Sequence, residues 1–535
     1  MNHFKYISPV FILLLLIFLW TSAQAAYGLK ASPEDSLKRQ INQLKIDMLT
    51  IEGIQRISCG YFDIPGDGQR LSDLPAFFRI AGALRPVAGS LIKIELWLPV
   101  NNWNERFLGT GNGGGAGKIV HASLASGIRR GYATANTDLG TSNGVNSAVG
   151  QPEIWKDFGY RATHLMTTVS KMIIKIFYGR SQHHSYFTGC STGGQQALME
   201  VQRYPQDYDG VIAAAPANNR THLHAGFLFH YQMLNQNGKP LFSKNELSFI
   251  AKRINQTYAV QSGGIKGDNF LTDPRRVRVN FDSLFKCGRG REETCLNQQQ
   301  LRIIKLIYAG PKDYPNSQQI YTPPPVGAEN IGGGLETQQT KSSAVGNFYP
   351  FLWALGRDFN PEEFDMNNDL RKLDSILAPI LNANNADISK FKNRGGKLIM
   401  YTGTSDPLVP YQDALNYYER VVTRQRGLKK TQDFFLYYLI PGMAHCGGGP
   451  GLSNFSGDLL EGLVDWVEHN MKLNQLEMKA LGCCQIESPP RFTRPVYPYP
   501  KFAVYKKGPV NHSGSFIPKI HLRKGVLVPA KKYLK

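Results

Sequence analysis

Runs of apolar residues divide this chain into segments that alternate between strand and helix. Residues 185–188 form a short strand-like run, and residues 195–200 after it have the pattern of a starting helix. Two longer apolar runs, 397–403 and 434–440, predict buried strands. Each run is followed by a loop that contains glycine, serine or proline. The pattern therefore predicts an α/β protein with polar loops at the ends of its strands.

The loop after residue 188 has the spacing of a nucleophile elbow. It reads Gly189-Cys190-Ser191-Thr192-Gly193, which is Gly-x-Ser-x-Gly between a strand and a helix. A serine at such a sharp turn exposes its hydroxyl, and the glycines let the helix approach the strand closely. By itself the pentapeptide fits an ordinary tight turn equally well. The other strand ends must decide between the two interpretations.

Those strand ends supply the partners that a catalytic serine needs. In hydrolases with this elbow, the residues come in the order Ser, acid, His. Asp406 follows the apolar run 397–403, and His445 lies in a glycine-rich loop after the run 434–440. Taken alone, Asp406 before a proline is more often a helix N-cap or turn residue. A glycine-rich loop has little packing need for an imidazole, so His445 favours the catalytic interpretation.

Two cysteines flank the candidate nucleophile and base. Cys190 directly precedes Ser191, and Cys446 directly follows His445. A disulfide between them would hold the serine turn and the histidine loop close together. The alternative is two buried free cysteines.

A glycine-rich segment, Gly111-Asn112-Gly113-Gly114-Gly115, follows another strand-like run. In a serine esterase, its amides and that of Thr192 would bind the tetrahedral oxyanion, and we expect Gly113 or Gly114 to be the second donor.

The same segment has a competing interpretation. Gly109, Gly111 and Gly114 match a dinucleotide-binding fingerprint, with Asp138 placed to hold a ribose. That interpretation leaves Ser191, Asp406 and His445 unexplained. A phosphate-binding P-loop is excluded, because Asn112 and Ile119 occupy its required glycine and serine/threonine positions.

The chain resembles the tannase and feruloyl esterase family, which also includes mono(2-hydroxyethyl) terephthalate hydrolase. The segments that carry the resemblance are residues 103–114, 132–138, 160–162, 186–193, 209–217 and 394–397, together with Asp406 and His445-Cys446. The resemblance implies an α/β-hydrolase core with a large inserted lid, and ester hydrolysis of small aromatic or phenolic acids. It implies Ser191, Asp406 and His445 as the catalytic triad and a bridge between Cys190 and Cys446.

The residues and the resemblance together predict a division of the chain. We expect a leader over residues 1–25, the first part of the core over 26–217, the lid over 218–390, the second part of the core over 391–500 and a basic tail over 501–535. The lid is rich in Asn, Gln, Gly and Pro, which predicts long surface loops. Lid side chains are expected to build the substrate pocket.

The lid departs from the family where a calcium loop is usual. Only Asp268 and Asp273 remain as carboxylates there, whereas Ca²⁺ takes six to eight oxygens. We therefore expect no cofactor, with calcium doubtful. A lid pair, Cys287 and Cys295, survives and is expected to close a short loop.

The N-terminal segment predicts the compartment in which the protein is found. Residues 11–19 are apolar and are followed by Ala23-Gln24-Ala25, a secretory leader with a cleavage site that is too short for a stable membrane span. An exported protein meets the oxidising conditions in which disulfides persist. Seven cysteines cannot all pair within the chain, so one of Cys59, Cys483 and Cys484 must be free or intermolecular.

The formal net charge is +20, partly from the C-terminal lysines and arginines. No nucleic-acid module accompanies this charge, so a solvated basic surface is the favoured explanation, with attraction to anionic surfaces as the alternative. The sequence thus predicts a secreted serine esterase acting on small aromatic esters. The rival is a secreted binding or effector protein that keeps the fold without turnover.

Overall fold

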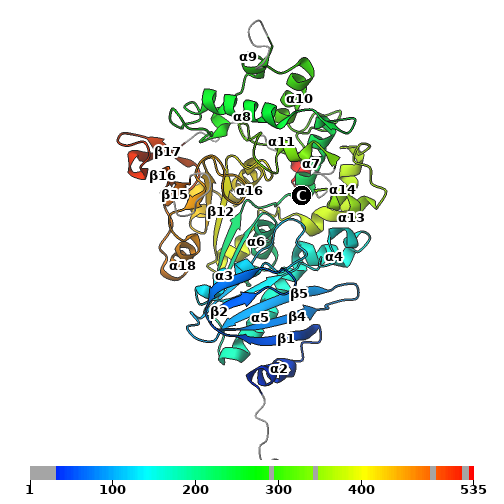
Figure 1. The fold of residues 1–535 in the computed structure, drawn as a ribbon, viewed down its shortest axis with the longest axis vertical. Helices are drawn as coiled ribbons and strands as arrows, with labels where there is room; N and C mark the ends of the chain where they lie inside the picture. Colours follow the sequence, from blue (N-terminus) through cyan, green and yellow to red (C-terminus); the bar gives the residue numbers. More distant parts are fainter. Residues whose placement is uncertain (1–31, 288–294, 342–346, 482–489, 521–528, 535) are drawn as a thin grey trace, which may run out of the picture.

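A mixed β-sheet of nine strands forms the core of the protein (Figure 1). The computed structural model describes residues 32–287, 295–341, 347–481, 490–520 and 529–534. In order across the sheet, the strands are β1 (Leu49–Ile57), β4 (Phe77–Leu84), β5 (Ile92–Pro99), β7 (Ala133–Thr137), β6 (Arg106–Thr110), β8 (His184–Cys190), β9 (Gly210–Ala214), β12 (Lys397–Gly403) and β13 (Phe435–Ile440).

The direction of the strands brings the predicted functional loops to one edge. β1, β4, β5 and β7 pair antiparallel, whereas every pair from β7 through β6, β8, β9, β12 and β13 is parallel. The carboxyl ends of β8, β12 and β13 therefore lie on the same side, where ligands bind in open α/β sheets. The three apolar runs are confirmed as strands, and residues 195–200 lie in helix α6 (Thr192–Arg203).

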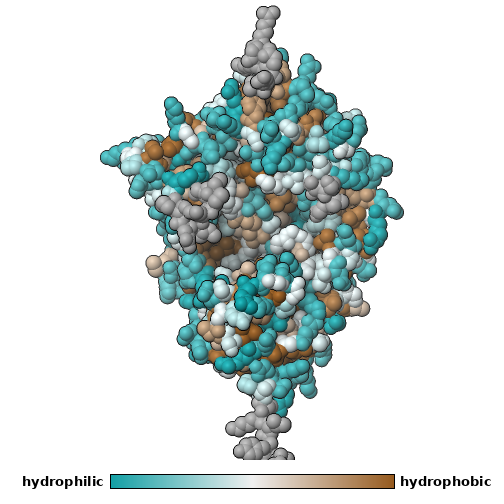
Figure 2. Space-filling model, in the orientation of Figure 1, coloured by the Kyte–Doolittle hydropathy of each residue, from teal (hydrophilic) through white to brown (hydrophobic). Residues whose placement is uncertain are grey.

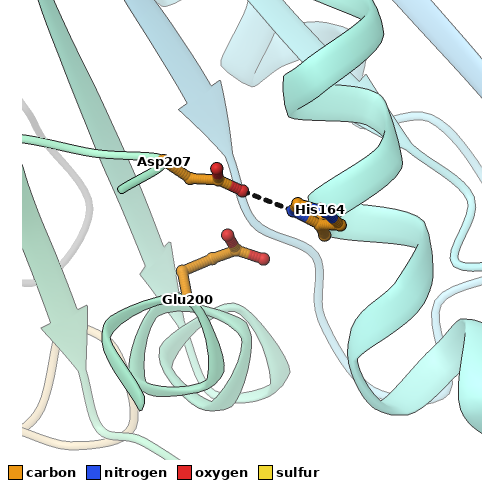
Figure 3. A group of neighbouring side chains, drawn as sticks. All are labelled: His164, Glu200 and Asp207. Carbon is orange, nitrogen blue, oxygen red and sulfur yellow. Dashed lines mark hydrogen bonds and ion pairs between the residues drawn. The ribbon is translucent and has the colours of Figure 1, made fainter. Parts of the chain in front are cut away.

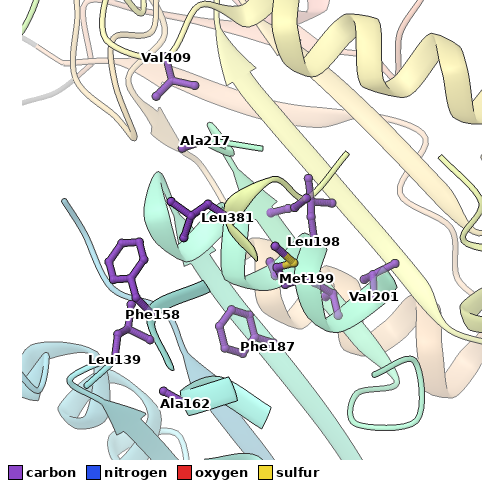
Figure 4. Close-up of a cluster of buried hydrophobic side chains, with 14 of the residues drawn as sticks. Leu139, Phe158, Ala162, Phe187, Leu198, Met199, Val201, Ala217, Leu381 and Val409 are labelled. Carbon is purple, nitrogen blue, oxygen red and sulfur yellow. The ribbon is translucent and has the colours of Figure 1, made fainter. Parts of the chain in front are cut away.

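Helices cover both faces of the parallel strands because successive strand residues point to opposite faces. Phe187 of β8 packs in the cluster of buried side chains drawn in Figure 4, together with Leu198 and Met199 of α6. Its neighbour Tyr186 packs on the other face, with Leu463 of helix α18. The first face is covered by α5 (Ala162–Tyr178), α6 and α16 (Tyr411–Arg424), and the second by α3 (His121–Arg129) and α18 (Leu459–His469).

Shorter elements complete the core. They are α2 (Pro33–Gln43), the hairpin of β2 (Gly60–Asp63) and β3 (Arg70–Leu74), α4 (Pro152–Lys156), the π-helical turn Asp157–Arg161 and α17 (Leu428–Gln432).

The segment between β9 and β12 combines helices with long loops. Its helices are α7 (Arg220–Leu234), α8 (Lys244–Tyr258), α9 (Phe281–Phe285), α10 (Gln298–Ala309), α11 (Leu335–Gln338), α13 (Tyr349–Leu355), α14 (Asn368–Leu381) and α15 (Ser389–Asn393), with the small ladder β10 (Asn235–Gln236) and β11 (Lys239–Pro240). Ile250 of α8 and Ile304 of α10 share a hydrophobic cluster in this segment. The expected loops are present over residues 310–334, where no helix lies, although residues 321–325 are buried rather than at the surface. Other polar residues of the segment begin helices: Asn297 and Gln300 form a capping box at α10.

The basic C-terminal segment is folded against the rest of the protein rather than free. After a three-stranded sheet of β14 (Asn454–Phe455), β15 (Leu476–Ala480) and β16 (Phe492–Val496), the chain forms a hairpin of β17 (Lys501–Tyr505) and β18 (Phe516–Ile520). Near the end, the Tyr533 hydroxyl donates to Asp313 and its carbonyl accepts from Asn219 of the lid segment. Tyr533 therefore joins the C-terminal segment to two residues of the lid segment.

No helix in the described part of the chain is long and apolar enough to span a membrane. The predicted leader, residues 1–25, lies outside the described residues, as do Cys483 and Cys484.

Candidate active site

Ser191 lies at the turn between β8 and α6, with a backbone φ of +64° that non-glycine residues seldom adopt. Glycine makes this turn possible. A Cβ on Gly189 would lie 2.4 Å from the carbonyl oxygen of Gly193, and one on Gly111 would lie 2.5 Å from the Cα of Gly193. The backbones of the elbow and the glycine-rich loop therefore lie in direct contact.

Asp406 is both a turn residue and the partner of His445, the two roles between which the sequence left a choice. Its Oδ1 accepts from the amides of Leu408 (3.0 Å) and Val409 (2.9 Å), which shapes the turn after β12. Its Oδ2 accepts from Nδ1 of His445 at 2.8 Å, and the carboxylate is fully buried. The turn thus fixes the carboxylate that orients the imidazole.

His445 is held in one orientation by this bond. Because Nδ1–H donates to Asp406, Nε2 is the nitrogen that can accept a proton. Burial lowers the pKa of His445, but the charge of Asp406 and its hydrogen bond outweigh burial, so the pKa lies above the ordinary value. A base with a raised pKa accepts a proton more readily.

Both predicted disulfides are present. Cys190 and Cys446 are joined across 256 residues, with their Cα atoms 5.9 Å apart, so the serine turn and the histidine loop are covalently tied. Cys287 and Cys295 close a short loop in the lid segment. Among the described residues, Cys59 is a free, exposed cysteine.

The donors expected for an oxyanion lie around Ser191. Thr192 is the first residue of α6, so its amide has no partner within the helix. In the glycine-rich loop, the amide of Gly111 donates to Thr188 (2.8 Å) and that of Asn112 to Gln196 (2.8 Å). Gly113 and Gly114 follow directly and line the same cleft as Ser191. The geometry leaves these two as candidates for the second donor.

Asp138 has a structural role that differs from the ribose contact of the rival interpretation. Its Oδ1 accepts from the amides of Lys93 (2.9 Å) and Gly140 (2.8 Å), and its side chain is buried. Burial raises its pKa to about 6. Oδ1 of Asp138 is thus used to hold Lys93 of β5 and the turn after β7 in place.

A cleft of about 970 Å³ contains Ser191 and His445. Its lining comes from the loop 111–114, α3 and the residues just before it, the ends of β8 and β9, residues 445–446 and 455–459, Tyr401 and Leu408. None of the described residues that line it belongs to the segment 218–390, so the expectation that lid side chains build the pocket around Ser191 is wrong for this cleft. The core helices and the histidine loop build it instead. Figure 2 shows a hollow with hydrophobic residues on the face where α3 and β12 lie.

One residue of the site was missed by sequence reasoning. Arg220, the first residue of α7, is 3% exposed and donates through Nη2 to the hydroxyl of Thr192 at 2.6 Å and through Nε to Gln195 at 2.6 Å. Its Nη1 donates to the hydroxyl of Tyr349. A lone arginine at the start of a predicted insertion carries no sequence signal of such a contact.

The residues of the expected calcium loop do not fit a calcium ion. Asp268 is bound at both oxygens by Arg494 of β16 (2.9 and 2.6 Å), and Asp273 is bound at both oxygens by Arg275 (2.8 Å each). All four side chains are buried. Each carboxylate is thus already neutralised by a guanidinium, and a cation there would have to displace Arg494.

A second group of titratable residues lies beside α6, shown in Figure 3. His164 Nδ1 lies 2.6 Å from Asp207 Oδ2, and Glu200 points toward both with no hydrogen-bond donor on either of its oxygens. Burial, followed by the neighbouring Asp207, raises the pKa of Glu200 well above its usual value. Lys171 donates to the backbone of Asp207, so a positive charge is already present. A proton on Glu200 would relieve the repulsion between the two neighbouring carboxylates.

A larger cleft of about 1190 Å³ lies at the opposite end of α6. Residues of α14, the end of α6 and Lys532–Leu534 line it, and it shares no lining residue with the cleft at Ser191. The 12 residues of α6 separate the two by about 18 Å at 1.5 Å per residue. Proximity to Ser191 therefore identifies the smaller cleft as the candidate active site.

Comparison with known proteins agrees with this geometry. Residues 79–518 match the family described as "Tannase and feruloyl esterase". The chain is 31% identical to an uncharacterized esterase of Xanthomonas campestris pv. campestris, over 86% of this chain and 87% of that protein. It is 30% identical to a probable feruloyl esterase B-2 of Neosartorya fischeri, over 81% and 84% of the two chains.

A solved structure shows the same fold. The crystal structure of an esterase from Aspergillus oryzae matches with a TM-score of 0.80 and 26% identity, over 89% of this chain and 97% of that one. The prediction of an α/β-hydrolase core with an inserted lid is thereby confirmed. The chain belongs to the tannase and feruloyl esterase family of carboxylic ester hydrolases.

Proposed function

We propose that this protein is a secreted serine esterase that hydrolyses esters of small aromatic acids through Ser191, His445 and Asp406. The observation that carries the proposal is the connection of three strand ends at one cleft. Ser191 and His445 line it, Asp406 binds His445, and the Cys190–Cys446 disulfide ties the two loops together.

The proposed reaction has two halves. His445 Nε2 takes the proton of the Ser191 hydroxyl while Oγ attacks the ester carbonyl, and Asp406 stabilises the imidazolium that forms. The Thr192 amide and Gly113 or Gly114 bind the oxyanion. The alcohol leaves with the proton from His445, and water then repeats the sequence on the acyl-enzyme and releases the acid.

The apolar side chains in the cleft support an aromatic acyl group. Tyr401 and Phe455 form an edge-to-face pair with ring centroids 5.2 Å apart, and both line the cleft with Ile212, Leu408 and Leu459. Aromatic rings prefer such edge-to-face neighbours. The relatives named as feruloyl esterases point the same way. The alcohol part of the ester is not specified by these contacts.

Two observations support secretion. The sequence begins with a leader-like apolar segment, and both disulfides would persist only in an oxidising compartment.

Hydrolysis of an ester panel by the wild type beside Ser191→Ala tests the proposal. Methyl ferulate, methyl gallate, a terephthalate monoester and 4-nitrophenyl acetate cover aromatic acids and a small aliphatic acid. We expect turnover of at least one aromatic ester, with kcat lowered by about 10⁴-fold or more in Ser191→Ala. Turnover of 4-nitrophenyl acetate alone would keep the triad and refute the aromatic preference. Folded protein that is silent on the whole panel would favour the binding or effector function.

A further inference from the structure

Arg220 is a buried cation without a carboxylate partner among the described residues. The groups that accept its hydrogen bonds are all neutral: the hydroxyl of Thr192, the amide oxygen of Gln195 and the phenol of Tyr349. Its guanidinium also lies over the ring of Phe158, 5.1 Å from the centroid. Burying an unpaired charge is costly, so a fold that keeps one needs a compensating use for it.

The bonds of Arg220 lead to both halves of the expected oxyanion site. Arg220 Nη2 donates to Thr192 Oγ1 at 2.6 Å, and the same hydroxyl donates to the carbonyl oxygen of Gly114 at 2.6 Å. Thr192 begins the elbow helix, and Gly114 belongs to the glycine-rich loop. The hydroxyl of Thr192 has one proton to give, and the bond from Arg220 leaves that proton free for Gly114.

We propose that Arg220 is a positioning residue for ester hydrolysis, which acts through the Thr192 hydroxyl to hold the elbow and the Gly113–Gly114 loop at the spacing that binds the oxyanion. This inference rests on the proposed function of Ser191. It also gives the lid a part in catalysis, although the lid supplies no described residue to the lining of the cleft.

The charge of Arg220 adds to the effect of its hydrogen bonds. It lies beside the N-terminus of α6, where the helix dipole is already positive, so it strengthens the field at the place where negative charge develops. Nearby His224 does not compete as a second cation, because burial and the charge of Arg220 lower its pKa to about 3. Arg220, and not His224, therefore supplies a positive charge next to the N-terminus of α6.

Phosphonylation of Ser191 by a 4-nitrophenyl alkylphosphonate tests the inference without a known substrate. The Ser191 Oγ–P bond forms, the P–O bond to 4-nitrophenolate breaks, and the serine proton passes to His445. The phosphoryl oxygen occupies the oxyanion site, so the rate reports on that site. Released nitrophenolate and intact mass measure the rate for wild type, Arg220→Gln, Thr192→Val and Thr192→Ser.

We expect Arg220→Gln and Thr192→Val each to slow the reaction about tenfold or more, because they break the same connection. Thr192→Ser, which keeps the hydroxyl, should react within about threefold of wild type. The double variant Arg220→Gln/Thr192→Val should be no slower than the slower single variant, since residues that act as a unit are not additive. Inhibition by a neutral aromatic amide, which places no negative charge in the oxyanion site, should change little.

A matched control separates positioning from general loss of structure. Arg106→Met removes a half-buried arginine that pairs with Glu468 at 2.7 Å at the amino end of β6, away from the cleft. It should lower the melting temperature and leave the phosphonylation rate unchanged. If Arg220→Gln does not fold, the contrast between Thr192→Val and Thr192→Ser decides.

The outcomes separate the two proposals. Wild type that is not labelled at Ser191 would remove the proposed function together with this inference. Labelled wild type, with Arg220→Gln or Thr192→Val reacting equally fast, would overturn the role of Arg220 alone. Additive effects in the double variant would also overturn it.

Discussion

The charge of Asp406 reaches the base of the proposed triad through one hydrogen bond of 2.8 Å. Both the charge and the bond favour the protonated imidazole, so the pKa of His445 lies above its ordinary value. Only the neutral imidazole can take the proton of Ser191. The acid limb of the pH–activity curve therefore reports directly on this contact.

Asp406→Asn should move that limb to lower pH, because removing the negative charge lowers the pKa of His445. We also expect kcat to fall by about 10⁴-fold, since the asparagine favours the wrong tautomer. The measurement is kcat/KM against pH for both proteins. A limb that stays in place in the variant would show that Asp406 does not set the pKa of the base.

The buried carboxyl group of Glu200 leads to a prediction about stability rather than activity. Its pKa is raised in the folded protein by burial and by Asp207, so the folded state holds a proton that the unfolded chain releases above about pH 4.3. The resulting stabilisation is complete below that pH and is lost as the pH rises toward the pKa of the folded state. The groups that face Glu200 are Asp207, His164 and Lys171.

Glu200→Gln should remove this part of the pH dependence, because an amide cannot ionise. Urea unfolding at pH 5, 7 and 9 measures it, with the exposed Glu477→Gln as the matched control. The wild type should lose stability relative to Glu200→Gln as pH rises. A melting temperature that rises with added Zn²⁺ or Mn²⁺ in wild type, and not in Glu200→Gln, would show that a metal rather than a proton holds the cluster.

At the scale of elements, two buried ion pairs hold the loop 262–274 of the lid in place. Asp268 reaches β16, 226 residues later, through Arg494, and Arg494 is stacked on Phe492 with its guanidinium carbon 4.6 Å from the ring centroid. Asp273 binds Arg275, whose guanidinium lies 5.1 Å from the ring centroid of Tyr499. These contacts join the lid to the C-terminal strands without a metal ligand.

Asp268→Asn should lower the free energy of unfolding by about 3–5 kcal/mol, because it leaves Arg494 buried without its counter-charge. Urea unfolding of wild type and variant measures the loss. Chelator should not change the stability of wild type, in contrast to what a calcium site would give. A large drop in melting temperature with EDTA, restored by Ca²⁺, would contradict this account of the loop.

The sequence predicts the core elements well and the lid poorly, for physical reasons. The strand at 397–403 is predicted to the residue because both of its faces are buried, which makes a continuous apolar run. The lid helices are not evident in the sequence because their caps and buried hydrogen bonds use side-chain amides, as Gln338 and Gln339 do. A composition rich in such amides is also typical of loops. Arg220 is hidden because its partners come from elements far apart in the chain.

At the scale of the whole molecule, the feature of interest is the positive charge that lies outside the candidate active site. The net charge is +20, and the larger cleft is lined by Arg203, Arg371 and Arg420. The carboxylates of the cleft, Asp313 and Asp374, bind Lys532 and His222, so among the described residues they form no ion pair with these three arginines. Amide side chains and the exposed Tyr314 line the same cleft. An acidic polymer is the partner that such a surface would attract.

We expect the protein to be retained on a polygalacturonate matrix at low salt and released as the salt concentration rises. Added ions screen exposed charges over about 10 Å at 0.1 M. Replacing Arg203, Arg371 and Arg420 by glutamine should reduce retention. The elution concentration on a salt gradient is the measurement.

The control removes the same charge elsewhere, from the exposed Lys38, Lys286 and Lys429. Equal loss of retention in the two triple variants would mean that net charge alone, and not the larger cleft, accounts for binding.

The disulfide between Cys190 and Cys446 joins the two loops that carry the proposed nucleophile and base. The nucleophile and the base lie on loops whose synthesis is separated by 256 residues, and the covalent tie between them requires an oxidant. A newly made chain in a reducing cytosol would have folded strands but two untethered catalytic loops. In the proposed secreted esterase, oxidation would therefore be the step that joins the two catalytic loops, and we expect full activity only after the chain has met an oxidant.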